Sequence, residues 1–304
     1  MLRLTEFEQI ESVFLGWQGR IEQISSGSFD GTLQVVAGDS VRAVSARGNQ
    51  RLRVQGRDRA GMLAIYPICE QMAQFQWNRA SLEPGQVFVI GPDDETDVAS
   101  DRRFSGQVMF LSPDKLESVA RLLRGTDGPS PARFSGVSTP SPAMFADLRG
   151  RLGRLFQMAG AAEAAIETPE SRQLEQHCLL ALAATILPDL KSPKLSATGR
   201  TRLLSRAMEL LHNHLDGRLG IIDLCEALDV SDRTLRMAFQ EQYGIGPMTY
   251  FRFLRLNAVR ARLRDRPEVA IADAAHEFGF HHLGNFAAQY RRLFGSLPSD
   301  IRRR

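Results

Sequence analysis

The strongest constraint on the fold of this 304-residue chain is an internal repeat near its C-terminal end. One copy, from Asp223 to Pro247, reads DLCEALDVSDRTLRMAFQEQYGIGP, and the other, from Asp273 to Pro298, reads DAAHEFGFHHLGNFAAQYRRLFGSLP. The Asp, apolar, Gly and Pro positions of the first copy return 50 residues later before the turn and 51 residues later after it. This agreement predicts two copies of one supersecondary unit, the second with a turn one residue longer.

Each copy has the pattern of a helix-turn-helix unit. In the first, helical spacing predicts a short helix, a turn at Asp229 and Val230, and a second helix whose N-cap is Ser231 and whose end is Gly244. The apolar side of the second helix faces the core, so its other side is available to the major groove of DNA. The predicted core residues of this copy are Leu224, Cys225, Leu228, Leu235, Ala238 and Phe239.

A third helix from Pro247 to about Arg264 is predicted to join the two copies. Proline is favourable in a first turn, and Pro267 blocks continuation of the helix. A helix of this length measures roughly 27 Å, so the two recognition helices are expected about one turn of DNA, ~34 Å, apart. Two interpretations of Arg255 on this helix stay open: it either fixes the helix in the core through a carboxylate or contacts a phosphate.

Positive charge is concentrated in the same region, although the formal net charge of the chain is only +3. Residues 200–304 carry 17 arginines and no lysine against 12 acidic residues, which leaves +5. The preceding residues carry 21 basic and 23 acidic residues, which leaves −2. Basic surfaces are attracted to the phosphates of DNA, while the alternative is a solvated basic face.

A motif of apolar, Gly, Pro and other characteristic residues extends through both copies and the helix between them. The motif comprises Leu224, Val230, Ser231, Leu235, Phe239, Gly244, Pro247, Tyr250, Arg255, Leu256, Ala275, Gly279, Phe280, Phe286, Tyr290, Gly295 and Pro298. Residues 200–304 thereby resemble the DNA-binding module of the AraC/XylS family of bacterial transcription regulators. Within that family, GIGPMTYFRFLRLNAVRARL and AAHEFGFHHLGNFAAQYRRLF look most like the ethanolamine-utilisation regulators. The resemblance implies promoter DNA and RNA polymerase as partners and activation as the usual outcome.

The outward faces of the two recognition helices supply the predicted DNA contacts. In the first copy these are Ser231, Arg233, Thr234, Arg236, Met237 and Gln240. In the second they are His281, His282, Asn285, Gln289, Arg291 and Arg292. Met237, Gly284 and Ala288 stand where the family commonly has Arg, Ser and Arg. We therefore expect the first copy to provide most base readout and the second to rely more on phosphate contacts, with solvated surface as the alternative for each position.

The N-terminal region predicts a strand-rich domain over residues 1–124. Short apolar runs at 33–36, 61–65 and 86–90 are separated by turn sequences, and a helix is expected around Thr5–Ser25. This layout resembles the cupin-like jelly roll of the family, so the predicted fold class is α+β: a cupin-like β-sandwich with flanking helices, followed by an all-α double helix-turn-helix domain. Linkers are expected at 125–142 and 188–199.

Two helices over residues 143–188 are expected between the linkers, with apolar residues spaced by three and four. Their apolar sides either pack on the N-terminal domain or form a dimerisation hairpin, which makes a homodimer one of the expected assemblies.

The N-terminal domain is the expected sensor for a small-molecule effector. Trp17, Tyr66 and Trp77 either line an apolar pocket or pack in the core. Arg47 and Arg51 have the R-x-x-x-R spacing with which some regulators of this family bind cyclic diguanylate, because two guanidiniums can hold phosphates and stack on guanines. The alternative is an arginine-rich surface hairpin.

Other classes of protein are disfavoured. All six histidines lie at position 177 or beyond, so a metal-dependent cupin enzyme is not expected, and neither a cofactor, a metal nor a catalytic residue is predicted. A bifunctional enzyme–regulator needs a reactive cysteine, and Cys69 lacks the surrounding motif. No signal peptide or apolar span is evident, so a cytoplasmic location is expected, without a membrane partner.

Overall fold

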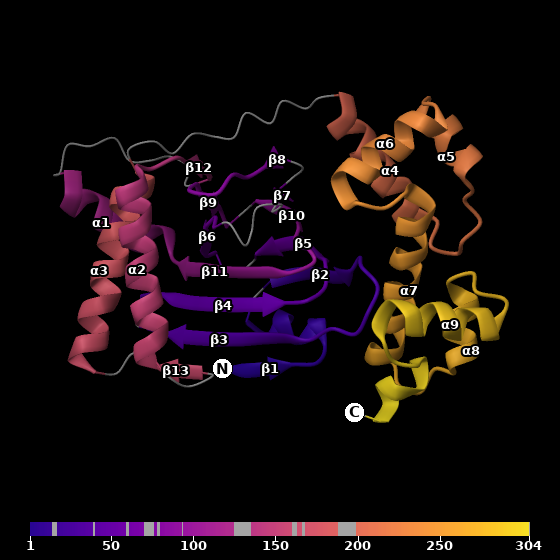
Figure 1. Ribbon diagram of the computed structural model, residues 1–304, viewed down its shortest axis with the longest axis horizontal. Helices are drawn as coiled ribbons and strands as arrows, with labels where there is room; N and C mark the ends of the chain where they lie inside the picture. The colour runs from indigo at the N-terminus through magenta and orange to yellow at the C-terminus, as the bar shows by residue number, and fades with distance from the viewer. Residues whose placement is uncertain are drawn as a thin grey trace. The chain divides into compact units, whose positions relative to one another are not determined.

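A computed structural model divides the chain into two compact units (Figure 1). It describes all residues except 14–16, 39, 59–60, 70–75, 78–79, 93, 125–134, 160–162, 166–167, 188–198 and 304. The first unit comprises Met1–Ile21 and Asp30–Lys194, and the second comprises Glu22–Phe29 and Leu195–Arg304. The short segment Glu22–Phe29 therefore belongs with the C-terminal residues rather than with its neighbours in the sequence.

Two β-sheets form the first unit. The larger has the strand order β1 (Leu2–Leu4), β3 (Gly31–Ala37), β4 (Arg42–Gly48), β11 (Phe104–Leu111), β6 (Leu63–Pro67), β9 (Val87–Ile90) and β12 (Gly136–Ser138), all antiparallel, with β13 (Glu163–Ala165) parallel to β3. The smaller has the order β2 (Trp17–Gln23), β5 (Leu52–Asp58), β10 (Glu95–Ala99), β7 (Gln76–Trp77) and β8 (Ala80–Ser81). The predicted strand-rich domain is confirmed.

One face of the larger sheet is covered by helices α1 (Pro113–Arg124), α2 (Pro142–Ala159) and α3 (Pro169–Ile186) (Figure 1). Residues paired directly across strands share a face, and one such row runs Val36, Ala43, Met109, Ile65 and Val89. All five are buried in one cluster with the apolar sides of these helices. The two helices predicted over 143–188 thus pack on the sheet within the first unit.

Two local expectations for this unit were wrong. The helix expected around Thr5–Ser25 is instead a short 3-10 helix, Phe7–Val13, followed by strand β2. Gly19 weakens helix formation there, and the chain gains a place in the smaller sheet. The linker expected at 125–142 contains strand β12, because Val137 pairs with Phe88 of β9; residues 125–134 lie outside the described part.

The second unit is all helical apart from its short N-terminal segment. Its helices are α4 (Gly199–Asn213), α5 (Ile221–Leu228), α6 (Asp232–Tyr243), α7 (Pro247–Asp265), α8 (Ile271–Glu277) and α9 (Leu283–Phe294), followed by a 3-10 helix, Pro298–Arg303. Helix α7 lies between two bundles, with α4, α5 and α6 at one end and α8 and α9 at the other (Figure 1). The predicted α+β class with a double helix-turn-helix domain is confirmed.

Candidate DNA-binding surface

The turn of the first helix-turn-helix unit is held by local backbone geometry. Asp229 ends α5 in the left-handed conformation with φ 53°, and the Val230 amide donates to the carbonyl of Cys225. Ser231 then caps α6, because its hydroxyl accepts a hydrogen bond of 3.2 Å from the Thr234 amide. Gly244 ends α6 with φ 69°. The predicted start, turn and end of this recognition helix are confirmed.

The core beneath α6 contains the predicted residues with one correction. Leu224, Leu228, Leu235, Ala238 and Phe239 are all buried. Cys225 is only partly buried and packs against the edge of this core, because it lies on the α5 side that turns toward solvent.

Aromatic rings join the recognition helix to α7. The ring of Phe239 lies 5.6 Å from that of Tyr250, and the ring of Tyr243 lies 4.4 Å from it, in edge-on or tilted contacts. This cluster fixes α6 against the central helix.

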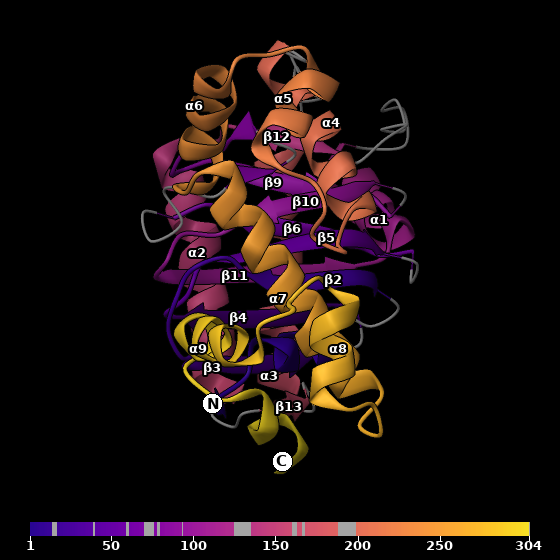
Figure 2. The ribbon, with the colours of Figure 1, turned by 90° about the vertical axis from the view of Figure 1, so that its right-hand side faces the viewer.

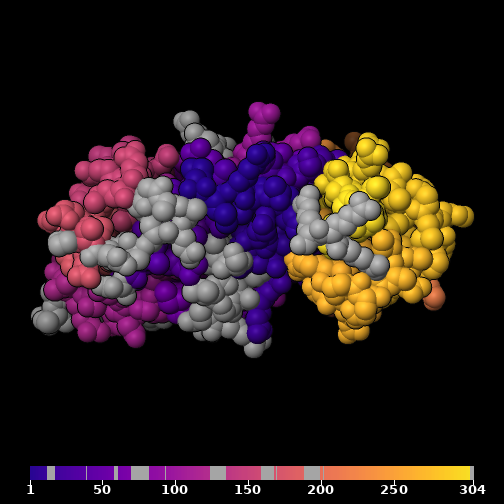
Figure 3. Space-filling view, turned by 90° about the horizontal axis from the view of Figure 1, so that it is seen from below, coloured from indigo at the N-terminus to yellow at the C-terminus, as the bar shows by residue number. Residues whose placement is uncertain are grey.

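The second helix-turn-helix unit has the same core plan with a different turn. Gly279 takes a left-handed conformation with φ 75°, and His282 occupies the N-cap of α9 without a side-chain cap bond. Phe280, Phe286, Tyr290 and Phe294 form a chain of ring contacts with centroids 5.3, 5.8 and 4.6 Å apart. The C-terminal part of the chain around these buried rings, coloured yellow, forms much of the visible surface of the second unit in Figure 3.

The outward face of α6 presents the predicted residues to solvent. Arg233, Thr234, Arg236, Met237 and Gln240 are all exposed. Arg236 donates to the Asp232 carboxylate one helical turn back at 2.7 Å, and this hydrogen bond raises the pKa of Arg236. For Arg233 the described part of the chain offers no acidic partner within ion-pair distance, so its guanidinium is available to an external anion.

The outward face of α9 distributes its charge differently. His281, His282 and Asn285 are exposed at its N-terminal end, and the Asn285 side chain accepts from Gln289 at 3.0 Å. The exposed arginines are Arg291 and Arg292, in the last turn, and within the described residues neither has a carboxylate within ion-pair distance.

Both recognition helices lie on the left of α7 in Figure 2, with α5 and α8 on the right. Both recognition helices therefore lie on the same side of the central helix of the second unit.

Of the two interpretations of Arg255, the structure supports a role in the core, but the partner is not a carboxylate. Its Nε donates to the carbonyl of Phe278 at 2.8 Å, and its guanidinium lies 4.4 Å from the centre of the Phe280 ring. Burial lowers the pKa of Arg255, with Asp216 acting in the opposite direction. The residue therefore holds α7 against the turn after α8.

Two buried polar residues of α7 were not predicted from the sequence. Asn257 and Arg260 are each 7% exposed. Arg260 lies 5.0 Å from the ring centre of Phe294 at the end of α9, and Asn257 bonds to the main chain of Gln23. The sequence does place these two polar residues among the apolar positions of the helix, which was a signal that they have a specific role. It does not show which groups they contact.

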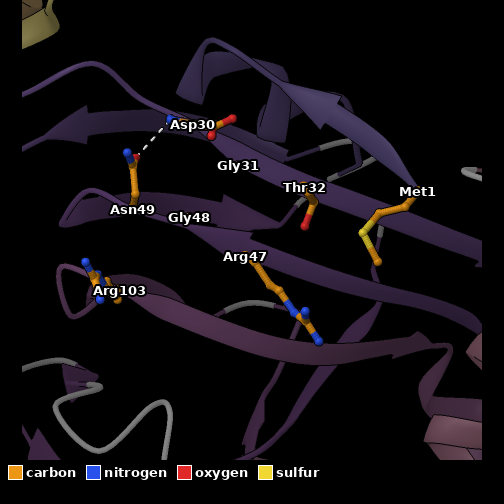
Figure 4. A pocket seen from close by; sticks show the side chains of 8 residues that line it. All are labelled: Met1, Asp30, Gly31, Thr32, Arg47, Gly48, Asn49 and Arg103. Carbon is orange, nitrogen blue, oxygen red and sulfur yellow. Dashed lines mark hydrogen bonds between the residues drawn. The ribbon is translucent and has the colours of Figure 1, made fainter.

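The polar end of the larger sheet of the first unit contains a groove of about 340 Å³ (Figure 4). It continues the face that carries α2 and α3: Thr32, Arg47 and Ser105 pair in one row across β3, β4 and β11. The residues that line the groove are Met1, Asp30, Gly31, Thr32, Arg47, Gly48, Asn49 and Arg103.

The groove brings Arg47 together with Arg103 rather than with Arg51. Arg51 donates through Nε to the carbonyl of Ser100 at 3.0 Å, and burial lowers its pKa. Tyr66 is half-buried with its ring 6.1 Å from that of Phe88, and the side chains of Trp17 and Trp77 lie outside the described part. Of the predicted ligand residues whose side chains are described, the groove therefore contains Arg47 but neither Arg51 nor Tyr66.

Among the described residues, no three His, Cys, Asp or Glu side chains lie close enough to hold a metal ion. Cys69 and Cys178 are buried, and burial raises the pKa of Cys178 to about 11. No helix in the described ranges is both long and apolar enough to span a membrane.

Comparison with known proteins gives a family match within the second unit and relatives that align over a larger part of the chain. Residues 224–304 match a family described as a helix-turn-helix domain. An XylDLEGF operon transcriptional activator 1 of Pseudomonas putida is 26% identical over 227 residues, which cover 73% of this chain and 66% of that protein. An XylDLEGF operon transcriptional activator 2 of the same species is 35% identical over 97 residues, covering 31% of this chain and 62% of the relative.

Among solved structures, an AraC-type transcriptional regulator from Chromobacterium violaceum is 28% identical, with a TM-score of 0.33. The match covers 34% of this chain and 93% of that one. The finer resemblance to ethanolamine-utilisation regulators stays a prediction. Helix geometry, the matching domain and the activator relatives agree: residues 224–304 form a helix-turn-helix domain, and the chain is similar to transcription activators of the AraC/XylS family.

Proposed function

We propose that this protein is a sequence-specific transcription activator that reads promoter DNA with α6 and α9 and responds to an effector bound by its first unit. The observation that carries the DNA-binding part is the pair of recognition helices, each with exposed polar residues, on one side of α7. Helices of this kind enter the major groove with their N-terminal residues against the base edges.

The two helices have different roles in this proposal. Arg233 and Arg236 stand in the first half of α6, where a guanidinium can donate two hydrogen bonds to one guanine. Arg291 and Arg292 stand in the last turn of α9, which favours phosphate contacts that position the protein without reading sequence.

The groove at Arg47 and Arg103 supports an effector with negative charge. Neither arginine has an acidic partner within ion-pair distance in the described residues, and both line a space of about 340 Å³, which is enough for a small effector. Cyclic diguanylate remains one such anion, but Arg51 is engaged elsewhere, so Arg103 replaces it in the proposed site. A homodimer and a contact with RNA polymerase remain predictions.

The DNA-binding part is tested with duplexes selected from a random library by the full chain. Fluorescence anisotropy against one selected and one scrambled duplex is measured for the parent and for Arg236→Ala. Arg151→Ala is the matched control, because Arg151 makes the same i,i+4 pair with Asp147 at 2.8 Å in the first unit. We expect Arg236→Ala to lose preference for the selected duplex and Arg151→Ala to keep it; equal behaviour of the two variants contradicts the proposal.

The effector part has its own test. Inorganic phosphate, a nucleoside monophosphate and cyclic diguanylate are titrated calorimetrically into the full chain and into Arg47→Ala and Arg103→Ala. Binding of one of these anions that both variants weaken supports the site. No heat from any of the three, or binding unchanged in both variants, contradicts it and leaves the DNA-binding result untouched.

A further inference from the structure

The segment Glu22–Phe29, here called the strap, is an integral part of the DNA-binding unit although it lies far from it in sequence. Its first two residues end β2, and its other residues lie in the connection from β2 to β3, both strands of the first unit's sheets. Glu22, Gln23, Ile24 and Phe29 are buried, at 4, 1, 2 and 6% exposure. The burial of Ile24 and Phe29 in a connection between strands indicates specific packing rather than a surface loop.

The strap is hydrogen-bonded to the central helix α7. The Gln23 amide donates to Asn257 Oδ1 at 3.0 Å, and Asn257 Nδ2 donates to the Gln23 carbonyl at 3.0 Å. The Asn257 side chain thus satisfies both backbone groups of one buried residue, as a neighbouring strand would. This explains a buried asparagine on α7 that the helix-turn-helix pattern alone leaves unexplained.

The strap also caps the second recognition helix. The last four carbonyls of a helix have no partner within it, and Leu293 is among them in α9. Its carbonyl accepts from Gln23 Nε2 at 2.6 Å and from the Gly27 amide at 3.0 Å. Ser28 packs so closely on Gly295 that a Cβ added there would lie 2.6 Å from the Ser28 Cβ.

At its other end the strap reaches the first helix-turn-helix bundle. Ile24 is buried in the core cluster formed by α4, α5, α6 and α7. Glu22 Oε1 lies 3.8 Å from His212 Nε2 of α4. Eight consecutive residues therefore contact the first bundle, the central helix and the end of α9.

We propose that the strap is a positioning element that fixes α9 relative to α6. Three of its residues carry this role: Ile24 in the first core, Gln23 on α7 and α9, and Gly27 on α9. Because the angle between two recognition helices sets the half-site spacing that a protein accepts, the strap would also set that spacing, a consequence that rests on the proposed DNA-binding function. A shift of β2 or β3 would reach the strap directly through the main chain.

The test measures the distance between the two recognition helices in the absence of DNA. Its result therefore does not depend on whether the proposed DNA binding is correct. Spin labels are attached to Met237→Cys on α6 and Ala288→Cys on α9, both exposed, in a Cys225→Ser background of the full chain. The strap variant is Gln23→Met, which keeps side-chain length and removes the donor to Leu293. The matched control is Gln34→Met, because Gln34 Nε2 caps α2 of the first unit at the Phe156 carbonyl at 2.8 Å.

We expect one narrow distance peak in the parent and in Gln34→Met, and loss of that single narrow peak in Gln23→Met. A peak in Gln23→Met as narrow as in the parent overturns the proposal. Equal broadening in both variants also overturns it, because the effect would then be general loosening.

Hydrogen exchange of the parent chain gives a second test, which does not depend on whether a variant folds. The amides of Gln23 and Gly27 both donate within the second unit, so they are expected to be protected together with those of α7. Exchange of these two amides at the rate of an unstructured peptide, while α7 stays protected, contradicts the role of the strap.

Discussion

In the first helix-turn-helix unit the exposed arginines, Arg233 and Arg236, stand in the first half of the recognition helix, whereas in the second they are Arg291 and Arg292, in its last turn. Beneath these faces the two units are alike: Phe239 and Phe286 are both buried, and Gly244 and Gly295 both end their helices in the left-handed conformation. The two units therefore share their core, which packing constrains, and differ in their exposed residues. This difference is the basis of the proposal that the first unit reads bases and the second mainly contacts phosphates.

The largest expected effect concerns the shared cores. Phe239→Ala and Phe286→Ala each remove a fully buried ring, which costs about 3–5 kcal/mol in such positions. We expect hydrogen exchange to show loss of protection in α6 for the first variant and in α9 for the second, of similar size. Leu148→Ala in the first unit is the control and should leave both helices protected. A much smaller loss for either ring would break the equivalence of the cores.

The next effect concerns the unequal faces. Arg236→Ala should reduce discrimination between a selected and a scrambled duplex by roughly 5- to 150-fold, the range for one bidentate arginine–guanine contact. Arg291→Ala should weaken binding to both duplexes equally and reduce its salt dependence, as expected for a lost phosphate contact. Anisotropy titrations at several salt concentrations measure both quantities. If Arg291→Ala lost discrimination between the duplexes and Arg236→Ala weakened binding to both equally, the roles of the two units would be reversed.

A smaller difference is expected at the N-caps. Ser231 accepts from the Thr234 amide, while His282 makes no side-chain cap bond. Ser231→Ala should therefore cost about 1 kcal/mol of helix stability, and His282→Ala should cost much less. Thermal unfolding followed by circular dichroism compares the two variants. Equal losses would show that the second turn is capped in another way.

The smallest effect is expected for Asp232→Asn, which removes the partner of Arg236. An exposed pair of this kind contributes little to stability, so the fold should be unchanged. Freed of its carboxylate, Arg236 should bind DNA slightly more tightly, by under about twofold. Asp147→Asn breaks the matching pair on α2 and should leave DNA affinity unchanged; weaker binding by Asp232→Asn would mean that Asp232 itself orients Arg236 for the bases.

The helix-turn-helix units could be predicted from the sequence because their determinants are local. Ser231 as a cap, Gly244 as a helix end and Leu235 as a core position follow from spacing within a dozen residues. Their duplication further along the chain added independent support. The exposed faces followed directly, since a helix side that is not apolar has no place in the core.

Long-range contacts could not be predicted in the same way. The bond from Gln23 to Leu293 joins residues 270 positions apart, and no spacing rule links them. Arg255 was expected to meet a carboxylate and instead meets a carbonyl and an aromatic ring, because tertiary packing decides which partner a buried guanidinium finds. Strand β2 was mistaken for helix for the same reason: its place in a sheet outweighs local propensity.

The most direct test of a base-reading unit paired with a phosphate-contacting unit is interference by guanine methylation and by phosphate ethylation on a selected duplex, with the full chain and with Arg236→Ala. Interfering guanines are expected where α6 lies, and interfering phosphates about 10 base pairs away on the same face where α9 lies, since the recognition helices would occupy successive major grooves. Arg236→Ala should erase the guanine cluster and leave the distant phosphate cluster. No guanine cluster in the parent, or a guanine cluster that survives Arg236→Ala, would contradict the account.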